Sequence, residues 1–159
     1  GSALMKRQGD GRIKALDDLN GKIVATQLGT STEKSMREHD EALKKQGKSG
    51  YKELKLFTAM PEAILSLANG QVDVVGSLLP NLAVIIKERP GTFELVGPMQ
   101  PDKTWLAWVA RPDDTDLRDY INGRIKELRN SGKLYELQQK WFGMRMEIPD
   151  TGYLPPDAL

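Results

Sequence analysis

The stretch Gly29-Thr30-Ser31-Thr32 joins an apolar segment to a pattern typical of a surface helix. Thr30, with Glu33 three residues later, has the spacing of a capping box, in which side chains satisfy the backbone donors of the first helical turn without any ligand. The same helix start offers backbone N–H groups at its positive end, and these can bind an anion. Because capping boxes are common, the spacing alone favours a structural role and leaves anion binding as the alternative.

The residue types needed for catalysis or metal binding are scarce. The chain has no Cys, which excludes disulfides, thiolate metal sites and a cysteine nucleophile. Its single His, His39, lies among charged residues of a helical pattern and is expected to be a surface side chain. A zinc site would need carboxylates alone, which is unusual, and nothing places a nucleophile beside His39. We therefore expect no cofactor, no metal and no enzymatic activity.

Length and composition describe a globular chain rather than a membrane-embedded or disordered one. The chain has 159 residues, of which 39% are hydrophobic and 28% are charged. No apolar run approaches the roughly 20 residues that a membrane span needs. Lys and Arg (23) nearly balance Asp and Glu (22), so we expect no nucleic-acid partner. The densest basic run is expected to be a solvated helix end and turn: Lys44, Lys45, Lys48, Lys52 and Lys55.

Strand and helix patterns alternate along the first two thirds of the chain. The expected strands cover residues 3–6, 23–25, 54–57, 72–77 and 93–96. The expected helices cover residues 13–19, 32–46, 61–68 and 80–86, and Pro61 and Pro80 stand in the first turns of the last two. This order predicts right-handed parallel units, and therefore an α/β fold whose mostly parallel sheet is flanked by helices.

Further apolar patterns complete the expected core. The apolar face of the helix at 61–68 consists of Ile64, Leu65, Leu67 and Ala68. Residues 105–110 form the most continuous apolar run and are expected to be a strand buried on both faces. Two amphipathic helices follow, and their apolar faces need a surface to cover: Leu117, Tyr120, Ile121, Ile125 and Leu128 on the first, and Leu134, Leu137, Trp141 and Phe142 on the second.

Three segments and their spacing resemble the extracellular solute-binding proteins of polar amino-acid ABC importers: "IKALDDLNGKIVATQLGTSTE", "MPEAILSLANGQVDVV" and "ARPDDTDLRDYINGRIKELRNSGKLYELQQKWFG". The resemblance covers residues 13–143. It implies a periplasmic-binding-protein-like fold, with two α/β lobes, two crossover strands and a ligand in the cleft between the lobes. It also implies a chain that lacks most of its first lobe.

The resemblance divides the chain into four parts. Residues 3–110 correspond to lobe two with the crossover strands, and residues 111–143 correspond to C-terminal helices that belong to lobe one. Residues 1–2 look like a tag remnant to be left out of fold reasoning, and residues 144–159 look like an irregular tail. Because most of lobe one is missing, we expect the apolar helix faces to drive self-association of the chain. The alternative is that these helices fold back onto an uncovered face of lobe two.

The resemblance also implies a ligand site. The turn at 29–32 would hold the carboxylate of the ligand, and Gln27 would face the cleft, with Ser77 and Leu78 at the end of the next strand. Family members that bind α-amino acids usually have an Asp, which holds the ligand ammonium, where this chain has Leu78. Asp73 is a poor substitute, since it is expected to lie away from the cleft. Either the missing lobe supplies the counter-charge or the ligand is not a standard α-amino acid.

The implied function is the solute-binding component of an ABC importer. Such a protein captures a small polar ligand, here one that bears a carboxylate, and delivers it to permease subunits in the membrane. Its implied location is the periplasm or the cell exterior, although no signal peptide is visible in the sequence. The alternatives are a ligand-sensing domain of a receptor or kinase and, less favoured, a dehydratase on the same scaffold, which would need an acid near the position of Leu78.

Overall fold

The computed structural model describes residues 1–99 and 107–147. The chain divides into two compact units, Gly1–Thr104 and Trp105–Leu159. We call them unit 1 and unit 2 and describe each by itself. Within the described ranges, none of the helices combines the length and the apolar character that crossing a membrane would require.

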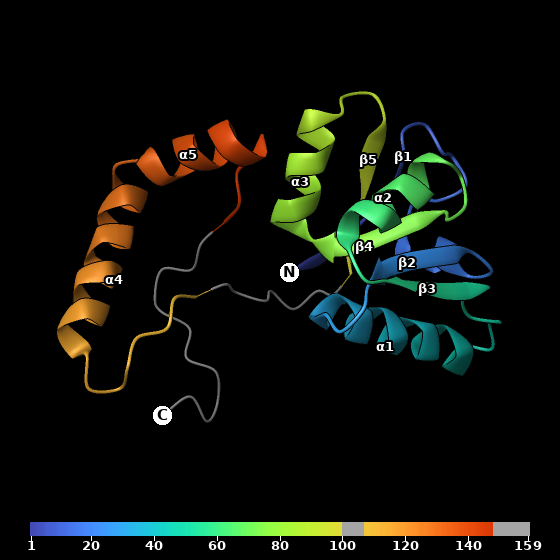
Figure 1. The fold of residues 1–159 in the computed structure, drawn as a ribbon, viewed down its shortest axis with the longest axis horizontal. Helices are drawn as coiled ribbons and strands as arrows, with labels where there is room; N and C mark the ends of the chain where they lie inside the picture. The colour runs from blue at the N-terminus through green and yellow to red at the C-terminus, as the bar shows by residue number, and fades with distance from the viewer. Residues whose placement is uncertain (100–106, 148–159) are drawn as a thin grey trace. The chain divides into compact units, whose positions relative to one another are not determined.

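Unit 1 is built on a five-stranded sheet with the order β3-β2-β4-β1-β5 (Figure 1). The central strand β4 pairs in parallel with β2, which in turn pairs in parallel with β3. Strand β1 runs antiparallel to both of its neighbours, β4 and β5. The sheet is therefore mixed and mostly parallel, as the sequence predicts. The strands are β1 (Ser2–Arg7), β2 (Ile23–Gln27), β3 (Glu53–Phe57), β4 (Val74–Leu78) and β5 (Phe93–Pro98).

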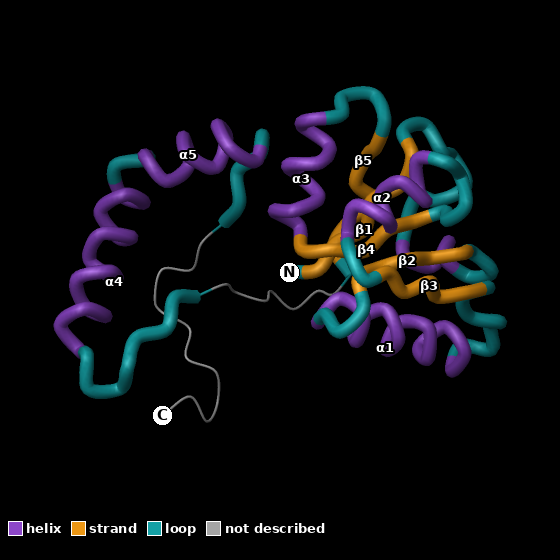
Figure 2. Tube along the Cα trace, viewed as in Figure 1, coloured by secondary structure: helices purple, strands orange, loops and turns teal. Residues whose placement is uncertain are grey.

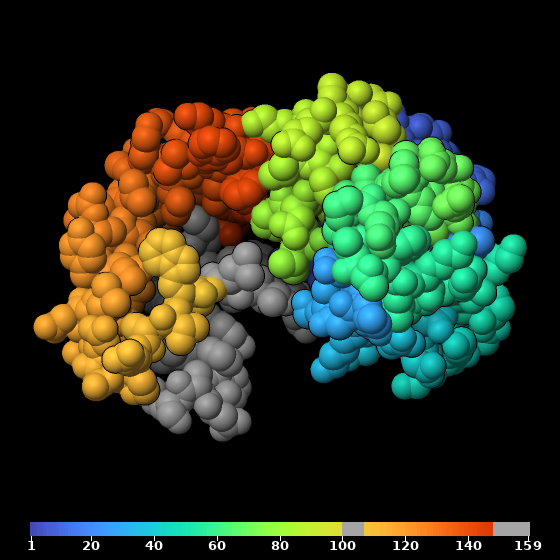
Figure 3. Space-filling view, in the orientation of Figure 1, coloured from blue at the N-terminus to red at the C-terminus, as the bar shows by residue number. Residues whose placement is uncertain are grey.

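Helices cover both faces of this sheet (Figure 2). Helix α1 (Ser31–Lys45) packs on one face together with the short 3-10 helix η1 (Leu16–Leu19), and α2 (Met60–Ala68) and α3 (Leu79–Glu88) pack on the other. In the space-filling view, the green atoms of α2 and α3 make up a large part of the visible face of unit 1 (Figure 3). This is the βα architecture that alternating strands and helices produce.

The core of unit 1 forms two layers, one on each side of the sheet. Neighbouring strand residues alternate between them, because successive side chains of a strand point to opposite faces. The layer under α2 and α3 is Ala3, Met5, Ala25, Ala63, Ile64, Leu67, Val72, Val75, Leu82 and Phe93. The layer under α1 is Leu4, Ile13, Leu19, Val24, Met36, Val74 and Met99.

Three local expectations for unit 1 were wrong. Leu65, which was assigned to the apolar face of its helix, is 59% exposed, because Ile64 and Leu67 already fill the side of α2 that meets the sheet. The expected helix at 13–19 is shortened to η1, and Ile13, which precedes η1, is buried in the core layer under α1. Ser2, which was left out of fold reasoning, opens β1 and pairs with Leu78.

Unit 2 contains two helices, α4 (Thr115–Asn130) and α5 (Lys133–Phe142). Gly132, between them, has a φ of 76°, and Gly143 ends α5 with a φ of 70°, which is left-handed backbone that glycine adopts without strain. Both helices are where the sequence predicts them, but α4 contains no buried residue. Four large apolar side chains on α4 and α5 are exposed: Leu117, Tyr120, Ile125 and Trp141.

The buried strand expected at 105–110 is wrong for the residues that the structure describes. Residues 107–110 are not in a strand, and the side chains of Trp108 and Val109 are 78% and 95% exposed. An apolar run becomes a strand only where a neighbouring strand accepts its backbone hydrogen bonds, and no described strand pairs with these residues. Residues 105 and 106 lie outside the described residues.

Candidate functional site

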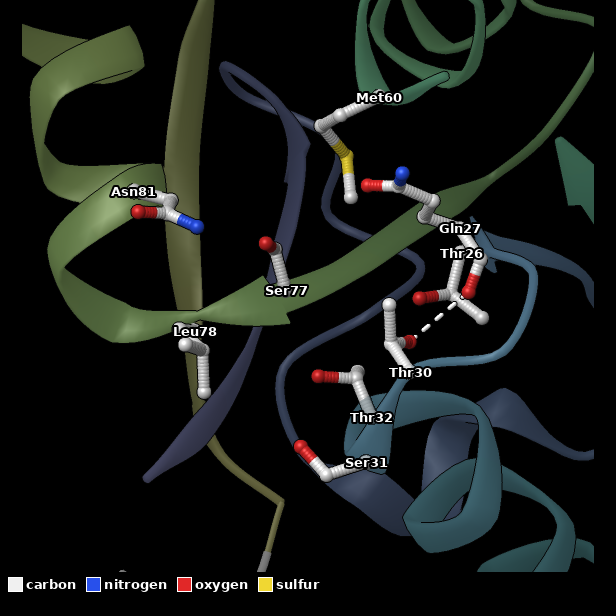
Figure 4. Close-up of a pocket in the computed structure, with 9 residues that line it drawn as sticks. All are labelled: Thr26, Gln27, Thr30, Ser31, Thr32, Met60, Ser77, Leu78 and Asn81. Atoms are coloured by element: carbon white, nitrogen blue, oxygen red, sulfur yellow. Dashed lines mark hydrogen bonds between the residues drawn. The ribbon is translucent and has the colours of Figure 1, made fainter. Parts of the chain in front are cut away.

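A cavity of about 260 Å³ opens at the carboxyl ends of β2 and β4 (Figure 4). Ligands of open α/β sheets commonly bind at this edge, where each parallel strand leads into a helix. Strand β2 leads into α1 and strand β4 leads into α3. The lining residues are Thr26, Gln27, Thr30, Ser31, Thr32, Met60, Ser77, Leu78 and Asn81.

The first turn of α1 forms one wall of this cavity. The side chain of Thr30 is the N-cap: its Oγ1 accepts a hydrogen bond from the Glu33 backbone N–H at 3.3 Å and donates one to the Gln27 carbonyl at 2.8 Å (Figure 4). The Glu33 carboxylate accepts from the Gly29 N–H at 2.8 Å. The Thr30 cap is confirmed, but Glu33 returns to Gly29, one residue before the position that a capping box would use.

Two backbone donors of this turn remain free within the described part of the chain. The N–H groups of Ser31 and Thr32 precede the first intrahelical bond and have no partner there. Ser31 is exposed and its hydroxyl bonds to no described residue, whereas the Thr32 hydroxyl lies 3.0 Å from the Ser2 hydroxyl. These two N–H groups can therefore receive an anion without breaking an existing hydrogen bond.

Gly76 lets α1 approach the sheet closely enough to form this wall. A Cβ atom at position 76 would lie 2.8 Å from the Sδ atom of Met36 and 3.0 Å from the Cγ2 atom of Thr32, both on α1. The Gly76 carbonyl also accepts a hydrogen bond from the Thr26 hydroxyl at 3.0 Å. A larger residue at this position would force the side chains of Met36 and Thr32 to shift.

The opposite wall comes from the end of β4 and the starts of α2 and α3. Ser77 is only 5% exposed, and its hydroxyl has no hydrogen-bond partner among the described residues. Figure 4 shows this hydroxyl pointing toward the side of the cavity where Met60 and Asn81 lie. Leu78 follows at the end of β4. Gln27 also lines the cavity, and its amide donates to the Thr58 carbonyl at 3.2 Å.

The sequence-predicted ligand residues lie on or beside one cavity. Gln27, Thr30, Ser31, Thr32, Ser77 and Leu78 line it, and Gly29, with a φ of 76°, forms the turn that leads into it. Three lining residues were missed: Thr26, Met60 and Asn81. Met60 and Asn81 lie at the starts of helices that follow parallel strands, and this position in the strand and helix pattern could have identified them as lining residues. Ligand binding by any of them stays a prediction.

None of the residues that line the cavity carries a charged side chain. The nearest described acid on α1, Glu33, is engaged by the Gly29 N–H and by Arg37, which hold the pKa of its carboxyl below the usual range. Asp73, as expected, is not part of the lining. Its carboxylate accepts from Arg12 at 2.9 Å and from the Ile23 N–H at 3.0 Å. The cavity therefore offers hydroxyl, amide and backbone N–H groups, but no counter-charge for a cation.

The single histidine is not the surface side chain that the sequence suggested. His39 is half-buried, and its Nδ1 lies 2.8 Å from the Tyr51 hydroxyl, because the chain after α1 returns alongside the helix. Burial lowers the pKa of His39, so its neutral form is favoured. It lines no part of the cavity. The described residues also contain no cluster of His, Asp and Glu that could hold a metal ion.

Comparisons with known proteins agree with this architecture. The L-cystine-binding protein TcyJ of Escherichia coli is 29% identical over 144 residues, a match that covers 89% of this chain and 49% of that protein. An ancestral arginine-binding protein, solved bound to glutamine, is 26% identical with a TM-score of 0.58 and covers 91% of this chain and 60% of that one. Substrate-binding domain 2 of Lactococcus lactis GlnP, in its open conformation, is 22% identical with a TM-score of 0.72, which shows a shared fold.

These matches describe binding proteins rather than enzymes, and they are longer than this chain. The match covers 91% of this chain and 59% of the GlnP domain. The chain spans about half the length of TcyJ, of which it covers 49%. The family model of bacterial extracellular solute-binding proteins, family 3, matches residues 1–144. The chain belongs to this family of bacterial extracellular solute-binding proteins.

Proposed function

We propose that this chain is part of the solute-binding component of an ABC importer for amino acids or related acids, which captures a carboxylate-bearing ligand and delivers it to permease subunits. The observation that carries the proposal is the single cavity that Ser31 and Thr32, with their free N–H groups, line together with Ser77. The name of one relative supports a carboxylate-bearing ligand, since TcyJ is an L-cystine-binding protein and cystine carries carboxylates. Family membership supports a location in the periplasm or outside the cell.

Each residue of the turn has a distinct role in this proposal. The Ser31 and Thr32 N–H groups bind the ligand carboxylate at the positive end of α1, where an anion is stabilised. The Ser31 hydroxyl adds a further donor, Gly29 provides the left-handed turn, and Thr30 holds the turn in place through its cap. Gln27, Ser77 and Leu78 contact the rest of the ligand. The sensor and dehydratase alternatives are not proposed, because no observation favours them.

Matched pairs of small molecules test the carboxylate site. We would follow the backbone amide signals of Ser31 and Thr32 by NMR while adding L-alanine or L-alaninamide, and L-lactate or L-lactamide. Within each pair the only difference is the carboxylate, so the expected result is a shift with at least one acid and none with its amide. Equal shifts with acid and amide, or no shift with any of the four, would remove the carboxylate site from the proposal.

We also propose that unit 2 supplies helices of the other lobe of the family fold. The exposed apolar side chains of α4 and α5 support this, since Leu117 is 46%, Tyr120 67% and Trp141 61% exposed. Burying a large apolar side chain is worth about 1.5–3 kcal/mol, so these faces favour association when nothing else covers them. Light scattering of the 159-residue chain is expected to show a dimer or larger species. A monomer mass at all concentrations would contradict self-association.

A further inference from the structure

The cavity receives the amino-terminal ends of three helices. Because β2, β3 and β4 are parallel, the helices that follow them, α1, α2 and α3, all begin at the same edge of the sheet. Residues from each first turn line the cavity: Ser31 and Thr32 from α1, Met60 from α2 and Asn81 from α3. Each helix start carries partial positive charge. The cavity is therefore polarised against a cationic group.

Two of these helix starts lack a side-chain cap, and one of the two also lacks an acid in its first turn. Neither α2 nor α3 has a side-chain hydrogen bond at its N-cap, where Ala59 and Leu78 stand. Helix α3 has no acid in its first turn, and the acid of α2, Glu62, accepts from the Thr58 hydroxyl at 3.3 Å and does not line the cavity. Within the described residues, an ammonium group placed here would find no carboxylate among the lining side chains.

Ser77 offers a neutral hydrogen-bond donor and acceptor on the wall of the cavity. Ser77 is 95% buried, its hydroxyl has no partner among the described residues, and it points into the cavity (Figure 4). A hydroxyl can donate one hydrogen bond and accept two. The Asn81 side chain, which also lacks a described partner, adds an amide donor and an acceptor. Together they match an uncharged polar group of a ligand.

We propose that the ligand of this cavity is a carboxylate whose neighbouring carbon carries an uncharged hydrogen-bonding group, either a hydroxyl or an acylated amine, instead of an ammonium. This inference rests on the proposed function, in which the carboxylate binds at the Ser31 and Thr32 N–H groups. It adds that Ser77 and Asn81 bind the uncharged group and that Leu78 gives the cavity a wall without a counter-charge. A free α-amino acid would place its ammonium unpaired beside the positive helix starts.

The test compares molecules that share the carboxylate and differ at the next carbon. L-lactate, N-acetyl-L-alanine and L-alanine are titrated separately into the 159-residue chain, and the amide signals of Ser31 and Thr32 report binding. L-alanine is expected to bind at least about tenfold more weakly than the better of the other two, because an ammonium that leaves water unpaired is penalised. Which of L-lactate and N-acetyl-L-alanine binds more tightly shows whether the ligand is a hydroxy acid or an acylated amino acid.

Two variants with the same change of charge sharpen the test. Leu78→Asp places a carboxylate at the cavity wall and is expected to reverse the order, so that L-alanine binds more tightly than L-lactate. Leu65→Asp makes the same change on the exposed outer side of α2, where Leu65 is 59% exposed, and is expected to leave the order unchanged. If Leu78→Asp does not fold, the comparison in the unmodified chain decides the question.

The failures of the two proposals are distinguishable. If L-alanine shifts the Ser31 and Thr32 signals with an affinity equal to or above that of the uncharged analogues, the preference against an ammonium is overturned while the carboxylate site stands. If none of the three molecules shifts these signals, the carboxylate site is overturned and this inference with it.

Discussion

The helix cap and the proposed carboxylate site share one turn but depend on different atoms, so stability and binding can be separated by mutation. Thr30 Oγ1 accepts from the Glu33 N–H at 3.3 Å and donates to the Gln27 carbonyl at 2.8 Å. Thr30→Ala removes both hydrogen bonds, and loss of an N-cap of this kind costs about 1 kcal/mol, within a range of about 0.5–2. Urea unfolding followed by circular dichroism is expected to show a lower urea concentration at the midpoint of the transition.

Ser31→Ala is the complementary change. The Ser31 side chain is exposed and bonds to no described residue, so this substitution is expected to change the free energy of unfolding by less than about 0.5 kcal/mol. It removes a donor beside the carboxylate, and a hydrogen bond to a charged group is worth about 1.5–3 kcal/mol, or roughly tenfold or more in affinity. The expected result is unchanged stability with weaker binding.

Ser35→Ala is the matched control on the same helix. The Ser35 hydroxyl donates to the Ser31 carbonyl at 3.2 Å, and Ser35 does not line the cavity. It is therefore expected to leave the NMR-detected affinity for L-lactate or N-acetyl-L-alanine unchanged. The reasoning would be refuted if Ser31→Ala bound as tightly as Ser35→Ala, or if Thr30→Ala unfolded at the same urea concentration as the unmodified chain.

Three further predictions concern the scaffold. Gly76→Ala is expected to cost about 1–3 kcal/mol of stability and to weaken binding, because the new Cβ would crowd Thr32; unfolding and NMR titration check both effects. A hydrogen bond from Arg12 lowers the pKa of Asp10 from 3.8 to about 2, so the stability that the ionised carboxylate provides is present above about pH 4 and lost as the pH falls through about 2. In urea unfolding, the difference between Asp10→Asn and the unmodified chain should therefore shrink as the pH falls over this window; a constant difference would contradict the assignment. Phe93→Ala is expected to cost about 3–5 kcal/mol, since Phe93 is 1% exposed, and a loss below 1 kcal/mol would contradict its place in the core.

Local patterns were sufficient to locate most elements of unit 1. Pro61 and Pro80 mark helix starts because proline fits the first turn, where its missing N–H group has no partner to lose. The structure places α2 at Met60–Ala68 and α3 at Leu79–Glu88. Thr30 was identified as the cap of α1 for a similarly local reason, since its oxygen reaches a backbone donor only three residues away.

Features that depend on distant contacts were not predictable in the same way. The pattern at 64–68 did not show that Leu65 would face solvent, because the width of the buried stripe of α2 is set by its contacts with the sheet. The apolar run at 105–110 was expected to be a strand, although strand formation depends on a partner elsewhere in the chain. Asp73 meets Arg12, which also binds Asp10, only after β1 and β4 come together in the sheet.

The missed cavity residues show how topology adds to a site what sequence patterns omit. Nothing about Met60 or Asn81 as residue types indicates binding. They line the cavity because parallel strands place the starts of successive helices at one edge, and each residue stands at such a start. The same arrangement also brings the positive ends of three helix dipoles to that edge. A ligand ammonium at this edge therefore needs a carboxylate side chain as its partner, and the described lining contains none. A ligand carboxylate needs only free N–H groups, which Ser31 and Thr32 provide.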